Sequence, residues 1–170
     1  MISAISFLAV GMIVFVFMSF TLVKTGDRPK TYTLPQLLQE KVEQDTRGMD
    51  VEQIIDYSLD LTASRLKFSR CNDVNNGKAN CVGYAQLCAD ICNQALALNG
   101  ISGHAKPVVG YVKSIGIYWC DVLQAVAPND NFKNFVKDHD FVEVATDLRT
   151  YYFDPSIYDV VGKKCLSITN

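Results

Sequence analysis

The chain lacks the residue patterns on which several common kinds of functional site depend. Its 170 residues include two histidines and contain no Cys-x-x-Cys pair, no His-Glu-x-x-His motif and no glycine-rich phosphate loop. Without these motifs, the sequence contains no pattern that would predict a zinc or nucleotide site, so we expect neither a metal nor a cofactor. Basic residues do not cluster beyond Lys24, Arg28 and Lys30, and the net charge is -2. This charge pattern disfavours nucleic acid as a partner.

Charge is also missing from the N-terminal segment. No charged residue occurs between Ile2 and Val23, and about 20 apolar residues are enough to cross a membrane as a helix. We therefore predict a transmembrane anchor over residues 1–23 and the membrane as a partner. The alternative is a cleaved secretory signal, but no Lys or Arg precedes the apolar run and no Ala-x-Ala pattern follows it.

The compartment of the domain depends on what flanks this segment. The basic residues after the apolar run predict that the domain faces the cytoplasm. A periplasmic or secreted location stays open, because the six cysteines would also suit an oxidising compartment.

The rest of the chain is predicted to form one globular domain, since 49% of all residues are apolar and 20% are charged. Gly26 and Pro29 indicate a polar linker over residues 24–32, which leaves residues 33–170 for the domain. Helical periodicity followed by β-branched and aromatic runs predicts an α+β fold, with N-terminal helices packed on an antiparallel sheet. The last helix is apolar on nearly every side and is expected at the centre. The predicted helices are residues 35–44, 50–67 and 81–98, and the predicted strands are residues 105–112, 117–126, 141–144 and 151–153.

Cys81 is the candidate nucleophile. Asn80 is a favourable N-cap, which would place Cys81 in the first turn of a helix, where backbone amides and the helix dipole favour a thiolate. Gly83 removes bulk beside it, and the amides of the same turn would be placed to bind an oxyanion. Two further cysteines on this helix are predicted to pack in the core rather than to bind a metal with His104; they are Cys88 and Cys92.

His139 is the candidate base, because it begins an alternating strand that would hold its ring at the edge of a sheet. His104 has no acidic neighbour in the sequence and is predicted to be structural or exposed. If the strand from His139 turns at Thr146–Asp147, the returning strand places Asp154 opposite His139, and another loop length would make it a diagonal neighbour. An aspartate there would accept a hydrogen bond from one ring nitrogen and present the other nitrogen to Cys81.

Several segments around these residues share the pattern of one protein family. Cys81 opens a predicted helix, His139 opens a strand, and Asp154 follows the next strand. With shorter matches between them, these segments resemble the transglutaminase-like superfamily over residues 50–160. The matching segments are Asn80–Ala85, Gly100–Ile101, Val108–Gly110, His139–Val144 and Phe153–Ser156.

The resemblance implies a papain-like fold and a catalytic triad in the order Cys, His, Asp. Cys81 would be the nucleophile, His139 the general base and acid, and Asp154 the orienting carboxylate. The chain departs from the family's commonest residues at three positions, which are Phe141 in place of Trp, Ser156 in place of Thr and Ala79 in place of Gly.

We therefore predict a membrane-anchored, cysteine-dependent acyl-transfer enzyme that acts on a protein or peptide. Hydrolysis of an amide bond through a thioester, by a peptidase or amidase, is the leading prediction. The alternatives are a transglutaminase that crosslinks proteins and a catalytically silent, membrane-tethered binding module of the same fold. A further alternative is a redox sensor in which Cys81 pairs with Cys71 or Cys120.

Overall fold

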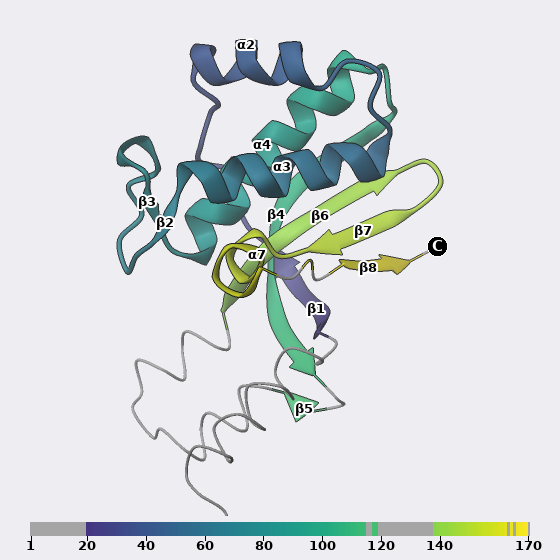
Figure 1. Cartoon of the computed structure of the whole chain (residues 1–170). Coiled ribbons are helices and arrows are strands. Elements are labelled where there is room, and N and C mark those ends of the chain that lie inside the picture. The colour runs from purple at the N-terminus through teal and green to yellow at the C-terminus, as the bar shows by residue number, and fades with distance from the viewer. Residues whose placement is uncertain (1–19, 115–116, 119–137, 163, 165, 170) are drawn as a thin grey trace, which may run out of the picture.

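The computed structural model describes residues 20–114, 117–118, 138–162, 164 and 166–169, and these form an α+β fold, as predicted (Figure 1). The helical elements are α2 (Gln36–Asp45), α3 (Val51–Arg65), the short 3-10 helix η1 (Val74–Asn76), α4 (Cys81–Leu98) and α7 (Pro155–Val161). The strands are β1 (Phe20–Asp27), β2 (Lys67–Phe68), β3 (Lys78–Ala79), β4 (Gly103–Ser114), β5 (Ile117–Tyr118), β6 (His139–Thr146), β7 (Thr150–Phe153) and β8 (Leu166–Thr169).

The main sheet is antiparallel and has the strand order β1-β4-β6-β7-β8, with β5 paired to β4. The predicted strands over residues 105–112, 141–144 and 151–153 are confirmed and extended, whereas most of the predicted strand over residues 117–126 lies outside the described residues. Short strands β2 and β3 pair in parallel and form a separate ladder before α4.

The predicted transmembrane helix over residues 1–23 is wrong. Phe20–Val23 are the first residues of β1, which pairs with β4 inside the sheet. Within the part of the chain that the structure describes, no helix is both long and apolar enough to span a bilayer, while residues 1–19 lie outside it. An uncharged apolar run without a clear period is compatible with a buried strand as well as with a helix. This ambiguity explains why the transmembrane prediction failed. The predicted membrane localisation depended on that helix and is therefore wrong as well.

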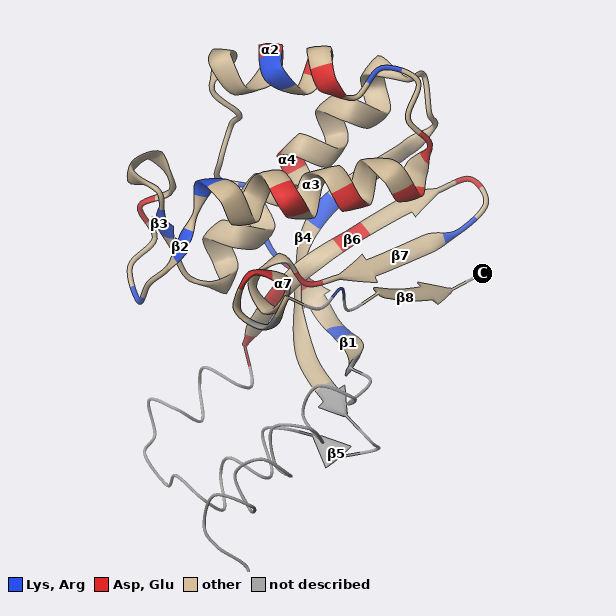
Figure 2. Cartoon of the chain, in the orientation of Figure 1, with Lys and Arg blue, Asp and Glu red and all other residues tan. Residues whose placement is uncertain are grey.

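The predicted linker over residues 24–32 is also part of the fold. Lys24–Asp27 continue β1, in which Lys24 pairs with Glu143 of β6 and Asp27 pairs with Lys106 of β4. Lys24 Nζ lies 2.8 Å from Glu143 Oε2, and Lys106 Nζ lies 3.2 Å from Glu143 Oε1. Figure 2 shows the basic residues spread over several elements, including β1 and β4, rather than gathered on one face. The folded domain therefore includes residues before position 33.

Helix α4 is central, as its apolar sequence predicts. It lies between α2 and α3 on one side and strands β4 and β6 on the other (Figure 1). Its side chains Tyr84 and Ile91 are completely buried, and the free thiols of Cys88 and Cys92 lie in the same core. Each large apolar side chain buried in this way contributes about 1.5–3 kcal/mol. The core therefore fixes the helix whose first residue is Cys81.

Candidate functional site

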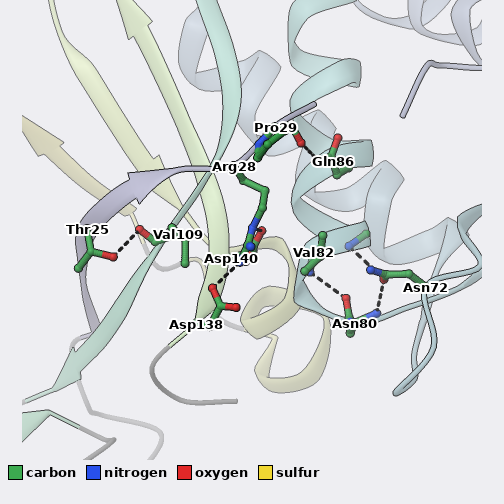
Figure 3. Close-up of polar contacts among 11 residues, drawn as sticks. Thr25, Arg28, Pro29, Asn72, Asn80, Val82, Gln86, Val109, Asp138 and Asp140 are labelled. Atoms are coloured by element: carbon green, nitrogen blue, oxygen red, sulfur yellow. Dashed lines mark hydrogen bonds and ion pairs between the residues drawn. The ribbon is translucent and has the colours of Figure 1, made fainter. Parts of the chain in front are cut away.

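Two asparagine side chains cap the start of α4, and Cys81 is its first residue. Asn80 Oδ1 accepts a hydrogen bond from the Val82 amide at 3.0 Å, as its predicted N-cap role requires. Asn72 Oδ1 accepts from the amides of Asn80 at 3.0 Å and Gly83 at 3.2 Å (Figure 3). These hydrogen bonds fix the residue at which the helix that carries the thiol begins.

Most of the amides that we expected to bind an oxyanion are already occupied. Val82 and Gly83 donate to the asparagine side chains, and the Tyr84 amide donates to the Asn80 carbonyl at 3.1 Å. The amide of Cys81 itself has no acceptor among the described residues. The prediction is therefore corrected to a single donor of this turn, the Cys81 amide.

Gly83 is required for a reason that differs from the expected one. A Cβ at this position would lie 2.6 Å from the Ala79 Cβ and 2.7 Å from Asn72 Oδ1. These separations are shorter than real Cβ contacts, so the glycine lets the preceding loop pack on the first turn of α4. The space beside the helix start is filled by Asn72 and does not widen the surroundings of the thiol.

His139 and Asp154 are in direct contact, although not in the predicted register. The ladder pairs Val142 with Phe153 and ends at the pair Ala145 and Thr150, so Asp154 lies diagonally across from His139. The loop between the two strands is longer than predicted, which makes the diagonal alternative the correct one. His139 Nε2 bonds to Asp154 Oδ2, and both side chains are buried.

Asp154 uses its two carboxylate oxygens for two different tasks. Oδ1 accepts from the Ser156 amide at 2.9 Å, the Ser156 hydroxyl at 2.8 Å and the Ile157 amide at 3.0 Å. These bonds cap α7, whose first residue is Pro155. Oδ2 faces His139. The cap therefore fixes the carboxylate that holds the imidazole.

The imidazole also lies next to the candidate nucleophile. Cys81 is close enough to His139 to interact with the ring, and this interaction helps to raise the pKa of His139. Because Nε2 of the ring is bonded to Asp154, Nδ1 is the nitrogen that remains for the thiol. The structure thus brings together Cys81 from α4, His139 from β6 and Asp154 from the start of α7; their catalytic roles stay a prediction.

The charges of the pair follow from this geometry. Burial by itself would lower the pKa of His139, but the negative charge and hydrogen bond of Asp154 and the interaction with Cys81 outweigh it and raise that pKa to about 10. Burial by itself would raise the pKa of Asp154, but the charge and hydrogen bond of His139 bring that pKa below its usual value. At neutral pH the site therefore holds an imidazolium bonded to a carboxylate.

This pair predicts how stability varies with pH. His139→Gln is expected to lower the free energy of unfolding by about 3–5 kcal/mol where both partners are charged, because it leaves a buried carboxylate unpaired. The raised pKa of His139 makes its stabilisation complete below 6.5 and lost as the pH rises through about 10. The lowered pKa of Asp154 makes its stabilisation complete above 3.8 and lost as the pH falls below that value.

The difference in the free energy of unfolding between the wild-type protein and His139→Gln is therefore expected to be largest between about pH 3.8 and 6.5. Urea denaturation at about pH 5, 8 and 10 measures the difference directly. A difference that grows between the second and third of these pH values would contradict the charged pair.

A second prediction concerns the cap of α4. Asn80→Ala is expected to lower the free energy of unfolding by about 1 kcal/mol. It should also slow alkylation of Cys81 about two- to fivefold, since the end of a helix favours a nearby thiolate by about 0.3–1 kcal/mol. Asp50 is a matched control, because it caps α3 in a capping box with Gln53. Asp50→Ala should lower stability similarly without slowing Cys81, and equal slowing in both variants would contradict this prediction.

The chain also contains a second histidine and further cysteines. His104 is exposed on β4, as predicted. Cys71 is an exposed free thiol, and Cys81 is also free, so the disulfide of the redox alternative is not formed between them. Cys120 lies outside the described residues. Burial, with the neighbouring Cys92, raises the pKa of Cys88 and keeps it protonated.

A pocket of about 230 Å³ lies beside the first turns of α4. Its walls come from Thr31–Tyr32, from the loop Asn72–Asn75 and from α4. Cys81 is not among its lining residues, so the pocket adjoins the helix start but does not enclose the thiol. No sequence pattern indicates that Asn72 binds the start of α4, because the amides that it accepts from follow only after a polar loop.

Comparison with models of known protein families and with curated proteins finds no match to this chain. The resemblance to the transglutaminase-like superfamily therefore stays a prediction from the residues. The chemistry of the site has to be inferred from its three side chains and their geometry.

Proposed function

We propose that the protein is a cysteine-dependent acyl-transfer enzyme that hydrolyses an amide bond in a protein or peptide. The observation that supports this proposal best is that His139 interacts with Cys81 and is hydrogen-bonded to Asp154. A thiol at a helix start, an imidazole beside it and a carboxylate that fixes the imidazole are the parts that nucleophilic catalysis needs. They come from α4, β6 and the start of α7, so their meeting depends on the fold.

In the first step, the Cys81 sulfur, which has passed its proton to His139, attacks the carbonyl carbon of the substrate as a thiolate. A C–S bond forms, the carbonyl electrons move to oxygen, and the Cys81 amide donates a hydrogen bond to the resulting oxyanion. The imidazolium of His139 then gives its proton to the departing nitrogen as the C–N bond breaks. The products are a free amine and a thioester on Cys81.

In the second step, water attacks the thioester. His139 accepts a proton from the water as the new C–O bond forms, and the sulfur leaves as the C–S bond breaks. Asp154 keeps the same ring orientation in both steps, because Oδ1 is fixed by the cap of α7. We assign water as the acceptor because, unlike the amine used by a transglutaminase, it needs no second substrate site.

The exposure of the three residues also supports a reactive thiol. Cys81 and His139 keep 4% and 7% of their surface exposed, whereas Asp154 has none. The core thiols Cys88 and Cys92 are also at 0%. Asp154 is therefore the most deeply buried of the three residues, and Cys81 and His139 keep the small exposed surface through which a substrate would have to reach them.

Competition for an alkylating reagent tests the proposal and separates it from a catalytically silent binding module. With limiting iodoacetamide at about pH 6, Cys81 is expected to be labelled at least about tenfold faster than the exposed Cys71, because only an activated thiol reacts well at that pH. Peptide mass mapping gives both rates in one sample. His139→Gln should remove the preference. Faster labelling of Cys71 in the wild-type protein would refute the enzyme and favour the silent module.

A further inference from the structure

The segment Arg28–Leu34, here called the strap, connects the sheet to α4. Its first residue donates from the backbone amide to the Pro107 carbonyl of β4 at 3.2 Å. Further along, the side chain of Gln86 on α4 donates to the Pro29 carbonyl at 2.7 Å (Figure 3). The same side chain accepts from the Thr31 amide at 3.0 Å. The strap is therefore bonded to both of the layers between which the site lies.

The side chain of Arg28 binds both sequence neighbours of His139. Arg28 Nε lies 2.8 Å from Asp140 Oδ2, and Nη2 lies 2.6 Å from Asp140 Oδ1. The same Nη2 also bonds to Asp138 Oδ1 (Figure 3). One guanidinium thus holds the residues immediately before and after the imidazole.

The two aspartates differ in what they need from Arg28. Asp140 has no exposed surface, and a buried carboxylate is stable only when it is paired with a charge or well hydrogen-bonded. Asp138 is exposed, so its ion pair with Arg28 contributes little to stability and mainly fixes the orientation of the guanidinium. The planar fork of an arginine fixes the orientation of a carboxylate that it binds through two nitrogens. Lysine, with its single nitrogen, would not fix it in that way.

His139 lies between these two anchors, where β6 begins. Asp138 immediately precedes β6 and Asp140 is its second residue. Arg28 therefore binds the chain on both sides of His139 in the sequence, while Asp154 holds the ring itself.

The far part of the strap is attached to the helix that carries Cys81. Gln86 is buried and lies on α4, one turn beyond the first turn of that helix. Lys30 Nζ also lies 2.5 Å from Asp90 Oδ1 of α4, but this pair comes from a half-exposed lysine and involves no residue adjacent to His139. The strap thus joins the start of β6 to the first half of α4, and these are the elements whose separation sets the approach of His139 to Cys81.

We propose that Arg28 is a positioning residue that, by binding Asp138 and Asp140 together, fixes the place of His139 relative to Cys81. The proposal rests on the proposed function, because a fixed imidazole matters to chemistry only if it serves the thiol. Arg28 acts through the strand and needs no contact with a substrate.

The test compares Arg28→Gln and Arg28→Lys with Lys30→Gln, which removes the other ion pair of the strap. The first readout is the set of imidazole NMR resonances, where the exposed His104 is the internal reference for His139 because the chain has only two histidines. The second readout is the labelling rate of Cys81 relative to Cys71. Arg28→Gln should shift the His139 resonances and reduce the labelling preference about tenfold, an effect of the size seen when a group is misplaced. Arg28→Lys should restore part of the His139 resonance positions and part of the labelling preference. Lys30→Gln should change neither the resonances nor the labelling preference.

A folded Arg28→Gln with unchanged His139 resonances would overturn the proposal, as would equal changes in Lys30→Gln. If Arg28→Gln does not fold, the double variant Arg28→Gln/Asp140→Asn removes the unpaired buried charge, and it should fold with the His139 resonances still shifted. Unshifted resonances in that double variant would likewise overturn the proposal. A wild-type protein whose Cys81 reacts no faster than Cys71 would refute the proposed function instead, whereas the NMR readout of Arg28 does not depend on reactivity.

Discussion

Cys81→Ser is expected to reduce amide hydrolysis by at least about 10⁴-fold, because the loss of one nucleophile removes the whole covalent route. Serine keeps the size and the hydroxyl can still bond to His139, so the free energy of unfolding should change by less than about 1.5 kcal/mol. The measurement is mass spectrometry of the protein mixed with a panel of peptide amides and thioester-forming acyl donors. The wild-type protein should gain the mass of the acyl group, and the variant should not.

Cys71→Ser is the matched control, because it removes an exposed thiol from the loop before α4 without touching His139. It should leave both hydrolysis and the acyl adduct unchanged. An adduct that persists in Cys81→Ser, or that is lost in Cys71→Ser, would show that the reactive thiol has been assigned to the wrong residue.

The parts of the site that could be predicted from sequence are those set by local structure. An Asn before a long apolar helix predicts an N-cap, and Asn80 has that role. Alternating residues after His139 predict a strand, and β6 begins at that residue. An Asp before Pro and Ser predicts a turn or a helix start, and Asp154 caps α7. Each of these signals lies within a few consecutive residues, so it can be interpreted without knowing the three-dimensional structure.

The parts that could not be predicted depend on partners distant in the sequence. Arg28 was interpreted as a charge flanking a membrane span, because its partner Asp140 follows only after most of the chain. The amide of Gly83 was expected to be available to an oxyanion, because the loop side chain of Asn72 that binds it could not be placed from sequence. The register of His139 and Asp154 depended on a loop length that turn chemistry alone did not fix.

The N-terminal error has a different cause. A run of apolar residues carries no information on whether its backbone bonds are made within a helix or to another strand. Phe20–Val23 pair with residues of β4, and Leu22 joins Val108 and Phe141 in a second buried cluster on the sheet. In β1, Thr21 is exposed and Leu22 is buried, but these few residues are too short a stretch to reveal strand alternation at the end of a long uncharged run.

Asp154→Asn is expected to reduce hydrolysis by about 10⁴-fold while the protein still folds, because the substitution changes the tautomer of His139 rather than its place. An Asn side chain has one oxygen and one NH2 group. The cap of α7 presents three donors, from Ser156 and Ile157, so the oxygen is expected to stay with the cap. The NH2 group must then face His139 Nε2, which can accept only if it carries no proton.

The proton of a neutral His139 would in that case lie on Nδ1, the nitrogen that faces Cys81. A neutral ring that is already protonated on Nδ1 cannot take the thiol proton, whereas the wild-type imidazolium already carries it. The ring of the variant could therefore not deliver that proton to the leaving nitrogen. The pKa of His139 should fall as well, since the charge of Asp154 raises it to about 10 and burial, which lowers it, remains. An NMR titration with the exposed His104 as reference would detect this fall in the folded variant.

Asp154→Ala separates the two tasks of this carboxylate. It removes the bond to His139 and the cap of α7 together, so it should lose about 1 kcal/mol of stability more than Asp154→Asn for the lost cap. Both variants should lose hydrolysis to a similar extent, because each deprives His139 of its acceptor. If Asp154→Asn kept normal hydrolysis while Asp154→Ala lost it, the residue would serve the fold through its cap, and the triad would reduce to Cys81 and His139.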